Sequence, residues 1–195
     1  EVVLHLAATA AAFALALELA ASLPVALLTA LLFGLHPAHV ESVAWISALN
    51  DPLFAIFAFL ALRSWIRWRA AGSPGSPWGT GVLLLLALFA KELALAVVPL
   101  AALHALLRAR RSEDPPGRFG GLTSGGLRAW LPLALAVLLW YAGRAAVFSE
   151  LSAGFTRITT WFGVGPARLV QLRIELLGGY TWLGLWPVDL KLFHP

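Results

Sequence analysis

The 195-residue sequence contains no cysteine and no methionine, and it is poor in charged residues. Without cysteine there is neither a disulfide framework nor a thiolate metal site. The missing methionine indicates a processed chain or a fragment of a longer one. Asp, Glu, Lys and Arg make up 12% of the residues, whereas soluble domains contain about 25%. An ordinary soluble enzyme, a coiled coil and a disordered chain are therefore excluded.

Apolar residues dominate what is present. They make up 60% of the chain, and the mean hydropathy is +0.82. This composition predicts an all-α, polytopic transmembrane helix bundle. The formal net charge is +4, and an excess of basic residues in a membrane protein is typical of cytoplasmic loops. We therefore expect no nucleic-acid partner.

Six apolar segments alternate with polar or Gly/Pro-rich stretches and are expected to form one transmembrane domain over residues 1–195. Two of the intervening stretches read as linkers, 70–80 and 112–126. Residues 38–49 are expected to form a short interfacial helix on the outer side. Tryptophans near segment ends, including Trp65 and Trp68, are expected to anchor the chain at the membrane interface. The apolar segments are 2–17, 23–35, 52–66, 81–107, 129–148 and 169–190.

Two arginine clusters flank the segment 81–107, and the positive-inside rule places both on the cytoplasmic side. One long helix would put the clusters on opposite sides of the membrane. A hairpin that turns near Lys91 and Glu92 keeps both inside. It also keeps these two charges out of the bilayer centre, where each would cost about 2.5–3.5 kcal/mol. We favour the hairpin over the single helix. The clusters are Arg63, Arg67 and Arg69, and Arg108, Arg110 and Arg111.

This orientation places Lys91, Glu92, Arg144 and Arg157 on the outer side, together with the polar segment 36–52. The outer arginines run against the charge rule, so we expect an external anion to compensate them. Arginine presents a planar fork that matches phosphate oxygens, which favours a phosphate-bearing lipid or substrate. Lys91 and Glu92 are sequence neighbours and do not face each other on a helix. Glu92 is therefore expected to pair elsewhere, with Arg144 as the candidate.

Four short motifs, in the same order along the chain, resemble those of the transmembrane and tetratricopeptide-repeat O-mannosyltransferases and their bacterial relatives. Together they cover nearly the whole sequence. The longest is LLFGLHPAHVESVAWISALNDPLFAIFAFLAL (31–62), similar through His36, Pro37, His39, Glu41, Val43, Trp45, Ser47 and Asp51. The others are AKELALAVVPLAAL (90–103), with Lys91, Glu92 and Pro99, then FTRITTW (155–161) and LWPVDL (185–190).

The resemblance implies a glycosyltransferase of the GT-C class in a bacterial inner membrane. Such an enzyme transfers a hexose, such as mannose, from a polyprenyl-phosphate sugar to a protein hydroxyl on the periplasmic or luminal side, and no cofactor is implied. Its partners are the lipid-linked donor, the protein acceptor and membrane lipid. The family's catalytic acid lies in an outer loop that would precede residue 1, so the chain alone is expected to be inactive. Leu49 departs from the family pattern, which has arginine there.

The charge argument and the resemblance together suggest roles for particular residues, although Arg144 lies in none of the four motifs. The donor phosphate is expected to bind Lys91, Arg144 and Arg157, and the cavity is expected to be lined by His36, His39, Glu41, Asp51 and Glu92. Simpler roles stay open: Asp51 as a helix N-cap, Lys91 and Glu92 as a snorkelling pair, and the arginines as headgroup contacts. No metal site is expected, because His39 and Glu41 would lie about 200° apart on a regular helix.

A transporter or channel module is the alternative function. Interrupted helices line the binding sites of many transporters, and Lys91 and Glu92 interrupt an otherwise apolar segment. A second, inverted copy of the helix pattern would favour this alternative, whereas tetratricopeptide repeats in the same protein would favour the glycosyltransferase.

Overall fold

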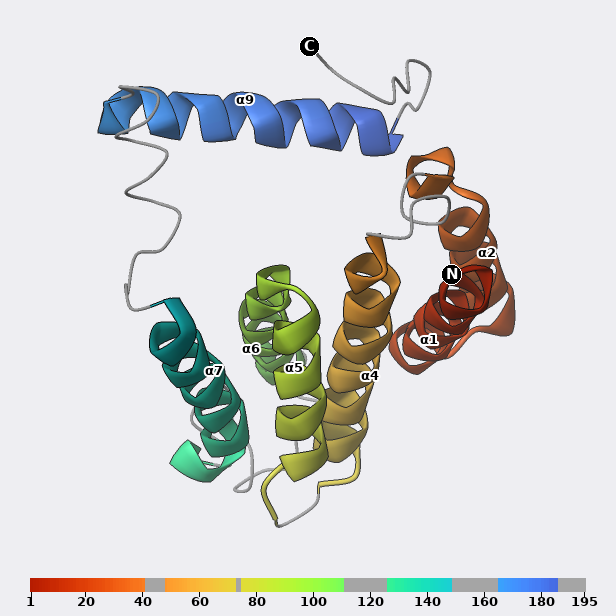
Figure 1. Cartoon of the computed structure of the whole chain (residues 1–195). Helices are drawn as coiled ribbons and strands as arrows, with labels where there is room; N and C mark the ends of the chain where they lie inside the picture. The colour runs from red at the N-terminus through yellow and green to blue at the C-terminus, as the bar shows by residue number, and fades with distance from the viewer. Residues whose placement is uncertain (41–47, 73–74, 111–125, 149–164, 186–195) are drawn as a thin grey trace.

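The computed structural model describes residues 1–40, 48–72, 75–110, 126–148 and 165–185, and these are helical with no strand among them (Figure 1). The predicted all-α class is therefore confirmed for the described part of the chain. The helices are α1 (Val2–Ala20), α2 (Leu23–Leu35), η1 (Pro37–His39), α4 (Asn50–Ala70), α5 (Trp78–Ala90), η3 (Glu92–Ala96), α6 (Val97–Arg110), α7 (Gly126–Phe148) and α9 (Pro166–Leu185).

Among the described residues, three helical stretches are long and apolar enough to cross a membrane, which is compatible with an integral membrane protein. Each has 19 or 20 residues, close to the length that a hydrocarbon core of about 30 Å requires. Two further apolar helices, α2 and α5, are shorter, with 13 residues each. The three long stretches are Val2–Ala20, Glu92–Arg110 and Arg128–Val147.

Helices α1 and α2 form a pair that the sequence places almost correctly. α2 has the predicted bounds, with Pro24 in its first turn, where a missing N–H costs nothing. α1 continues three residues beyond the predicted run and includes Glu18. The helix can carry this charge because its carboxylate pairs with Arg63 and Arg67 of α4. The pair is close-packed at Gly34, where an added Cβ would lie 3.0 Å from a Thr9 methyl.

The core of the bundle lies between α4, α5, α6 and α7. It consists largely of alanine and leucine, with α5 packed between α4 and α7. Small side chains allow helix backbones to approach closely, as is common in membrane bundles. Trp65 is fully buried, and its ring lies 5.5 Å from that of Trp68 and 4.9 Å from that of Trp130. The expectation that Trp65 anchors the chain at the interface is therefore wrong.

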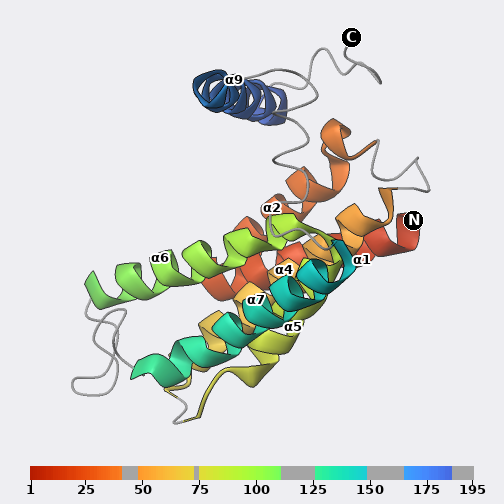
Figure 2. The same ribbon diagram turned by 60° about the vertical axis from the view of Figure 1, so that its left-hand side comes forward.

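The chain reverses direction at Lys91, as the favoured hairpin requires. α5 ends at Ala90, Lys91 is extended (φ −157°, ψ 133°), and η3 leads into α6. In Figures 1 and 2 the start of α5 and the end of α6 lie at the same end of the bundle. The described arginines of the two clusters thus share one end, here called the arginine end, and the Lys91 turn lies at the other; Arg111 lies outside the described residues.

Several predicted boundaries need correction. The first linker is shorter than 70–80, because α4 ends at Ala70 and α5 already begins at Trp78. The second ends before Gly126, the first residue of α7, and its remaining residues lie outside the described part of the chain. Arg67 and Arg69 belong to the last turn of α4 rather than following it. There they interact favourably with the negative end of the helix dipole.

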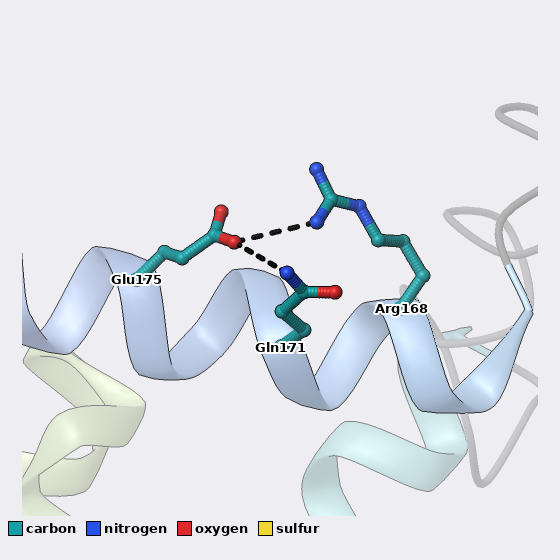
Figure 3. Close-up of polar contacts among 3 residues, drawn as sticks. All are labelled: Arg168, Gln171 and Glu175. Atoms are coloured by element: carbon teal, nitrogen blue, oxygen red, sulfur yellow. Dashed lines mark hydrogen bonds and ion pairs between the residues drawn. The ribbon is translucent and has the colours of Figure 1, made fainter.

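Helix α9 lies across the bundle at the Lys91 end, transverse to α4 and α7 (Figures 1 and 2). It is one continuous helix, although Arg173, Glu175, Gly178 and Gly179 interrupt its apolar pattern. Within α9, Glu175 accepts a hydrogen bond from Gln171, one turn earlier, at 2.9 Å, and another from Arg168, two turns earlier, at 3.3 Å (Figure 3). Apolar residues such as Ile174 and Leu177 are largely exposed.

Candidate functional site

Four charged residues from separate elements gather at the Lys91 end of the bundle. Asp51 lies in the first turn of α4, Lys91 directly follows α5, Glu92 begins η3, and Arg144 lies in α7. Residues far apart in the sequence meet here because the helices alternate in direction. The structure therefore brings together four of the eight site residues that the sequence predicted.

Lys91 forms an ion pair with Asp51, in which Nζ donates to Oδ1. Asp51 is not the N-cap residue of α4, because the helix begins at Asn50 and Leu49 precedes it. The N-cap alternative is therefore wrong. A carboxylate in the first turn is favoured by the positive end of the helix dipole, so α4 holds Asp51 in place and Asp51 in turn orients the lysine.

Glu92 forms the second ion pair, with Arg144, as the sequence predicted. The distance from Arg144 Nη1 to Glu92 Oε2 is 3.0 Å. The guanidinium also lies 5.6 Å from the centre of the Trp140 ring, one turn earlier on α7, where a cation–π contact adds attraction. Because Lys91 is extended, it and Glu92 point to different partners, and the two neighbours bind two different helices. The structure thus gives each of the two residues its own ion-pair partner.

A pocket of about 1040 Å³ lies beside these ion pairs, between α5, η3 and α7. Lys91, Glu92 and Arg144 contribute the charged part of its lining. The remainder is mostly apolar and includes Phe89, Leu93 and Val137. Such a lining fits a ligand that has an anionic group and an apolar chain. The volume is at the upper end of the range of about 300–1,000 Å³ that is common for small-molecule sites.

The histidines lie apart from this pocket, where α1, α2 and η1 meet. His36 accepts the amide N–H of Ala38 at Nδ1 (3.2 Å) and contacts the Gly184 carbonyl of α9 through Nε2 (2.9 Å). Because a carbonyl only accepts, Nε2 is the donor in this contact. The prediction that His36 and His39 line the same cavity as Lys91 is therefore not supported by the lining of the pocket.

His39 packs between two other rings rather than facing an open cavity. Its ring centre lies 4.6 Å from Phe33 and 5.3 Å from His5. Burial lowers the pKa of His39 from its ordinary value of 6.5, and positive charge on His5 and His36 lowers it further, while Asp51 acts in the opposite direction. Within the described ranges, no three His, Cys, Asp or Glu side chains are arranged to hold a metal ion.

Two predicted site residues, Glu41 and Arg157, lie outside the described residues. Conversely, sequence reasoning missed Trp140 and Tyr141, which line the pocket. The spacing of Trp140 and Arg144, four residues apart on a helix, was the available signal, because such residues share a face.

Comparison of the chain with models of protein families, with curated proteins and with solved structures finds no match.

Proposed function

We propose that the chain belongs to a membrane glycosyltransferase that takes a hexose, such as mannose, from a polyprenyl-phosphate donor and transfers it to a protein hydroxyl. The observation that supports this proposal is the pocket beside Lys91 and Arg144, where two cations border an otherwise largely apolar lining. A polyprenyl-phosphate sugar has the matching chemistry: a phosphate for the cations and a long hydrocarbon chain for the apolar wall.

In this mechanism the protein stabilises the charge that grows on the leaving phosphate. Hydrogen-bond donors that are already oriented need no reorganisation when the charge develops. Asp51 orients Lys91 and Glu92 orients Arg144, so neither cation needs to reorganise as the sugar–phosphate bond breaks. A guanidinium carries five N–H donors, and Arg144 can therefore keep Glu92 while it binds the phosphate.

Asp51 and Glu92 act as positioning residues in this proposal, because each is paired with a cation. The base that takes the proton of the acceptor hydroxyl is a separate acidic group, as the family resemblance implies. Arg157, which lies outside the described residues, is proposed as a third phosphate ligand from the sequence alone. With the Lys91 end on the periplasmic side of a bacterial inner membrane, α9 would lie in the membrane interface with its apolar side chains toward lipid.

The test is a transfer assay with lipid-linked donor, using membranes that contain the natural protein. We expect Lys91→Gln and Arg144→Gln each to lower transfer by about 10²-fold, the usual effect of losing one preorganised donor. Arg168→Gln is the matched control: Arg168 is also paired with a carboxylate but belongs to α9 and is not among the residues that line the pocket. Equal transfer by all three variants would refute the assigned roles.

A transporter module stays the second candidate, because a half-length apolar helix ends at two charges. In a discontinuous transmembrane helix, however, the chain keeps its direction past the break. Here α5 and α6 run in opposite directions (Figure 1), which favours the glycosyltransferase.

A further inference from the structure

The opposite end of the bundle holds a second, smaller pocket that the proposed transfer reaction does not use. It has a volume of about 370 Å³ and lies between α4 and α5. Its lining is Leu60, Arg63, Ser64 and Arg67 of α4 and Leu83 of α5. The four α4 residues follow the spacing i, i+3, i+4 and i+7, which puts them on one face of the helix.

The charges at this pocket are unequal. Arg63 and Arg67 both approach the same oxygen of Glu18, with Nε–Oε1 distances of 3.5 and 3.4 Å. Two guanidinium groups against one carboxylate leave one unit of positive charge in excess. Neither nitrogen forms a hydrogen bond with the carboxylate at these distances, and Arg63 Nε is buried without a hydrogen-bond partner. Donors therefore remain for an additional anion.

Two features of α5 add to the attraction for an anion. Thr80 is fully buried and its hydroxyl donates to Ser64 Oγ at 3.1 Å, so the Ser64 hydroxyl can turn its own proton toward a ligand. Thr80 also lies in the first turn of α5, whose amides form the positive end of that helix dipole. Hydroxyl, dipole and guanidinium groups thus converge at one place.

The pocket is polar at one end and apolar at the other. Arg67 lies nearest the arginine end of α4, Arg63 and Ser64 lie one turn away, and Leu60 lies a further turn toward the middle of the bundle. On α5, Leu83 lies about one turn past Gly79, which is near the start of the helix, and thus also toward the middle of the bundle. This order matches a lipid whose phosphate is at the membrane surface and whose acyl chain runs inward. Basic pockets between membrane helices bind anionic headgroups in this way.

We infer that the Arg63–Ser64–Arg67 pocket binds the phosphate of an anionic phospholipid of the leaflet at the arginine end. The phosphate bridges the two guanidinium groups and accepts from the Ser64 hydroxyl, while the acyl chain packs against Leu60 and Leu83. The site is separate from the proposed sugar-donor pocket and does not depend on its function.

Native mass spectrometry of the detergent-purified full chain tests this inference by titration with phosphatidylglycerol and, separately, with phosphatidylcholine. We expect preferential binding of phosphatidylglycerol, about five-fold weaker in Arg63→Gln and in Arg67→Gln, the effect typical of one basic residue near an anionic surface. Arg110→Gln is the matched control, because it removes the same charge at the same end from an exposed position outside the pocket. An equal loss in this control would show diffuse attraction and overturn the site.

Two further arms keep the test decisive. Glu18→Gln removes the competing carboxylate, so we expect tighter binding of phosphatidylglycerol; unchanged or weaker binding would contradict the charge argument even if an arginine variant failed to fold. Inorganic phosphate and glycerol phosphate serve as soluble competitors. Displacement of the lipid by either at comparable concentration would assign the pocket to a free phosphate and overturn the lipid assignment.

Discussion

Gly81 marks a close approach of α5 to α7, and replacing it with alanine tests the packing on which the pocket beside Lys91 depends. An added Cβ at Gly81 would lie 2.7 Å from both the Cβ and the carbonyl oxygen of Pro132, and 3.0 Å from its carbonyl carbon. Favourable contacts need about 3.5–4.0 Å. The two helices would therefore have to separate by about 1 Å, since neither a proline ring nor a backbone carbonyl can rotate away.

The size of the effect follows from two opposing terms. Alanine is a better helix former than glycine by about 1 kcal/mol. Overpacking a well-packed contact costs about 1–3 kcal/mol, and here the separation would also loosen the buried Leu84 and Leu133. We expect Gly81→Ala to lower the free energy of unfolding by about 1–2 kcal/mol.

Thermal or denaturant unfolding in detergent measures this difference, and Gly143→Ala is its matched control. Gly143 is also inside a helix, but an added Cβ there meets nothing within 4 Å. The control should be neutral or more stable by up to about 1 kcal/mol. If Gly81→Ala proved as stable as Gly143→Ala, the close α5–α7 contact would be wrong.

Two other predictions concern charge at the Lys91 end. A double-mutant cycle with Arg144→Gln and Glu92→Gln should give a coupling of about 0.2–1 kcal/mol in unfolding free energy, small because both side chains are partly exposed to solvent screening; strict additivity would contradict the ion pair. The folded state depresses the pKa of His39, so the unfolded chain binds more protons as pH falls below 6.5, and stability should decrease there. A thermal melt series should show this decrease, and His39→Asn should weaken it; an unchanged slope would refute the assignment.

Local sequence signals were sufficient to predict where most helices lie in the chain, but not which helices contact one another. The bounds of α2 follow from Pro24 and an uninterrupted apolar run, and the Lys91 reversal follows from the cost of charges in a bilayer. Gly178 and Gly179 interrupt the apolar pattern of the segment 169–190, but both lie inside the continuous helix α9. Glycine lowers helix stability by only about 1 kcal/mol per residue, which neighbouring residues can offset.

The candidate site was likewise predictable only in part from the sequence. Pairing of Glu92 with Arg144 was predictable, because Lys91 was excluded as its partner by adjacency and few outer cations were left. The separation of His36 and His39 from the pocket was not predictable, since it depends on how α1 and α2 dock beside α4. Burial of Trp65 likewise depends on tertiary packing: tryptophan at a helix end is typical of an interface, and only the neighbouring Trp68 and Trp130 rings show that this one is enclosed.

The two ends of the bundle differ in how their charges are balanced, and this difference bears on orientation. Within the described ranges, the Lys91 end carries four Lys or Arg residues and four carboxylates, whereas the arginine end carries six arginines and one carboxylate. The positive-inside rule counts basic residues, and acidic residues contribute little. By that count we expect the arginine end to face the cytoplasm. The apparent exceptions, such as Arg144 and Arg168, are each paired with a glutamate. These arginines therefore need no external anion in the resting protein. A donor phosphate at Arg144 would be held by guanidinium N–H groups that Glu92 does not use, and by their orientation, rather than by uncompensated positive charge.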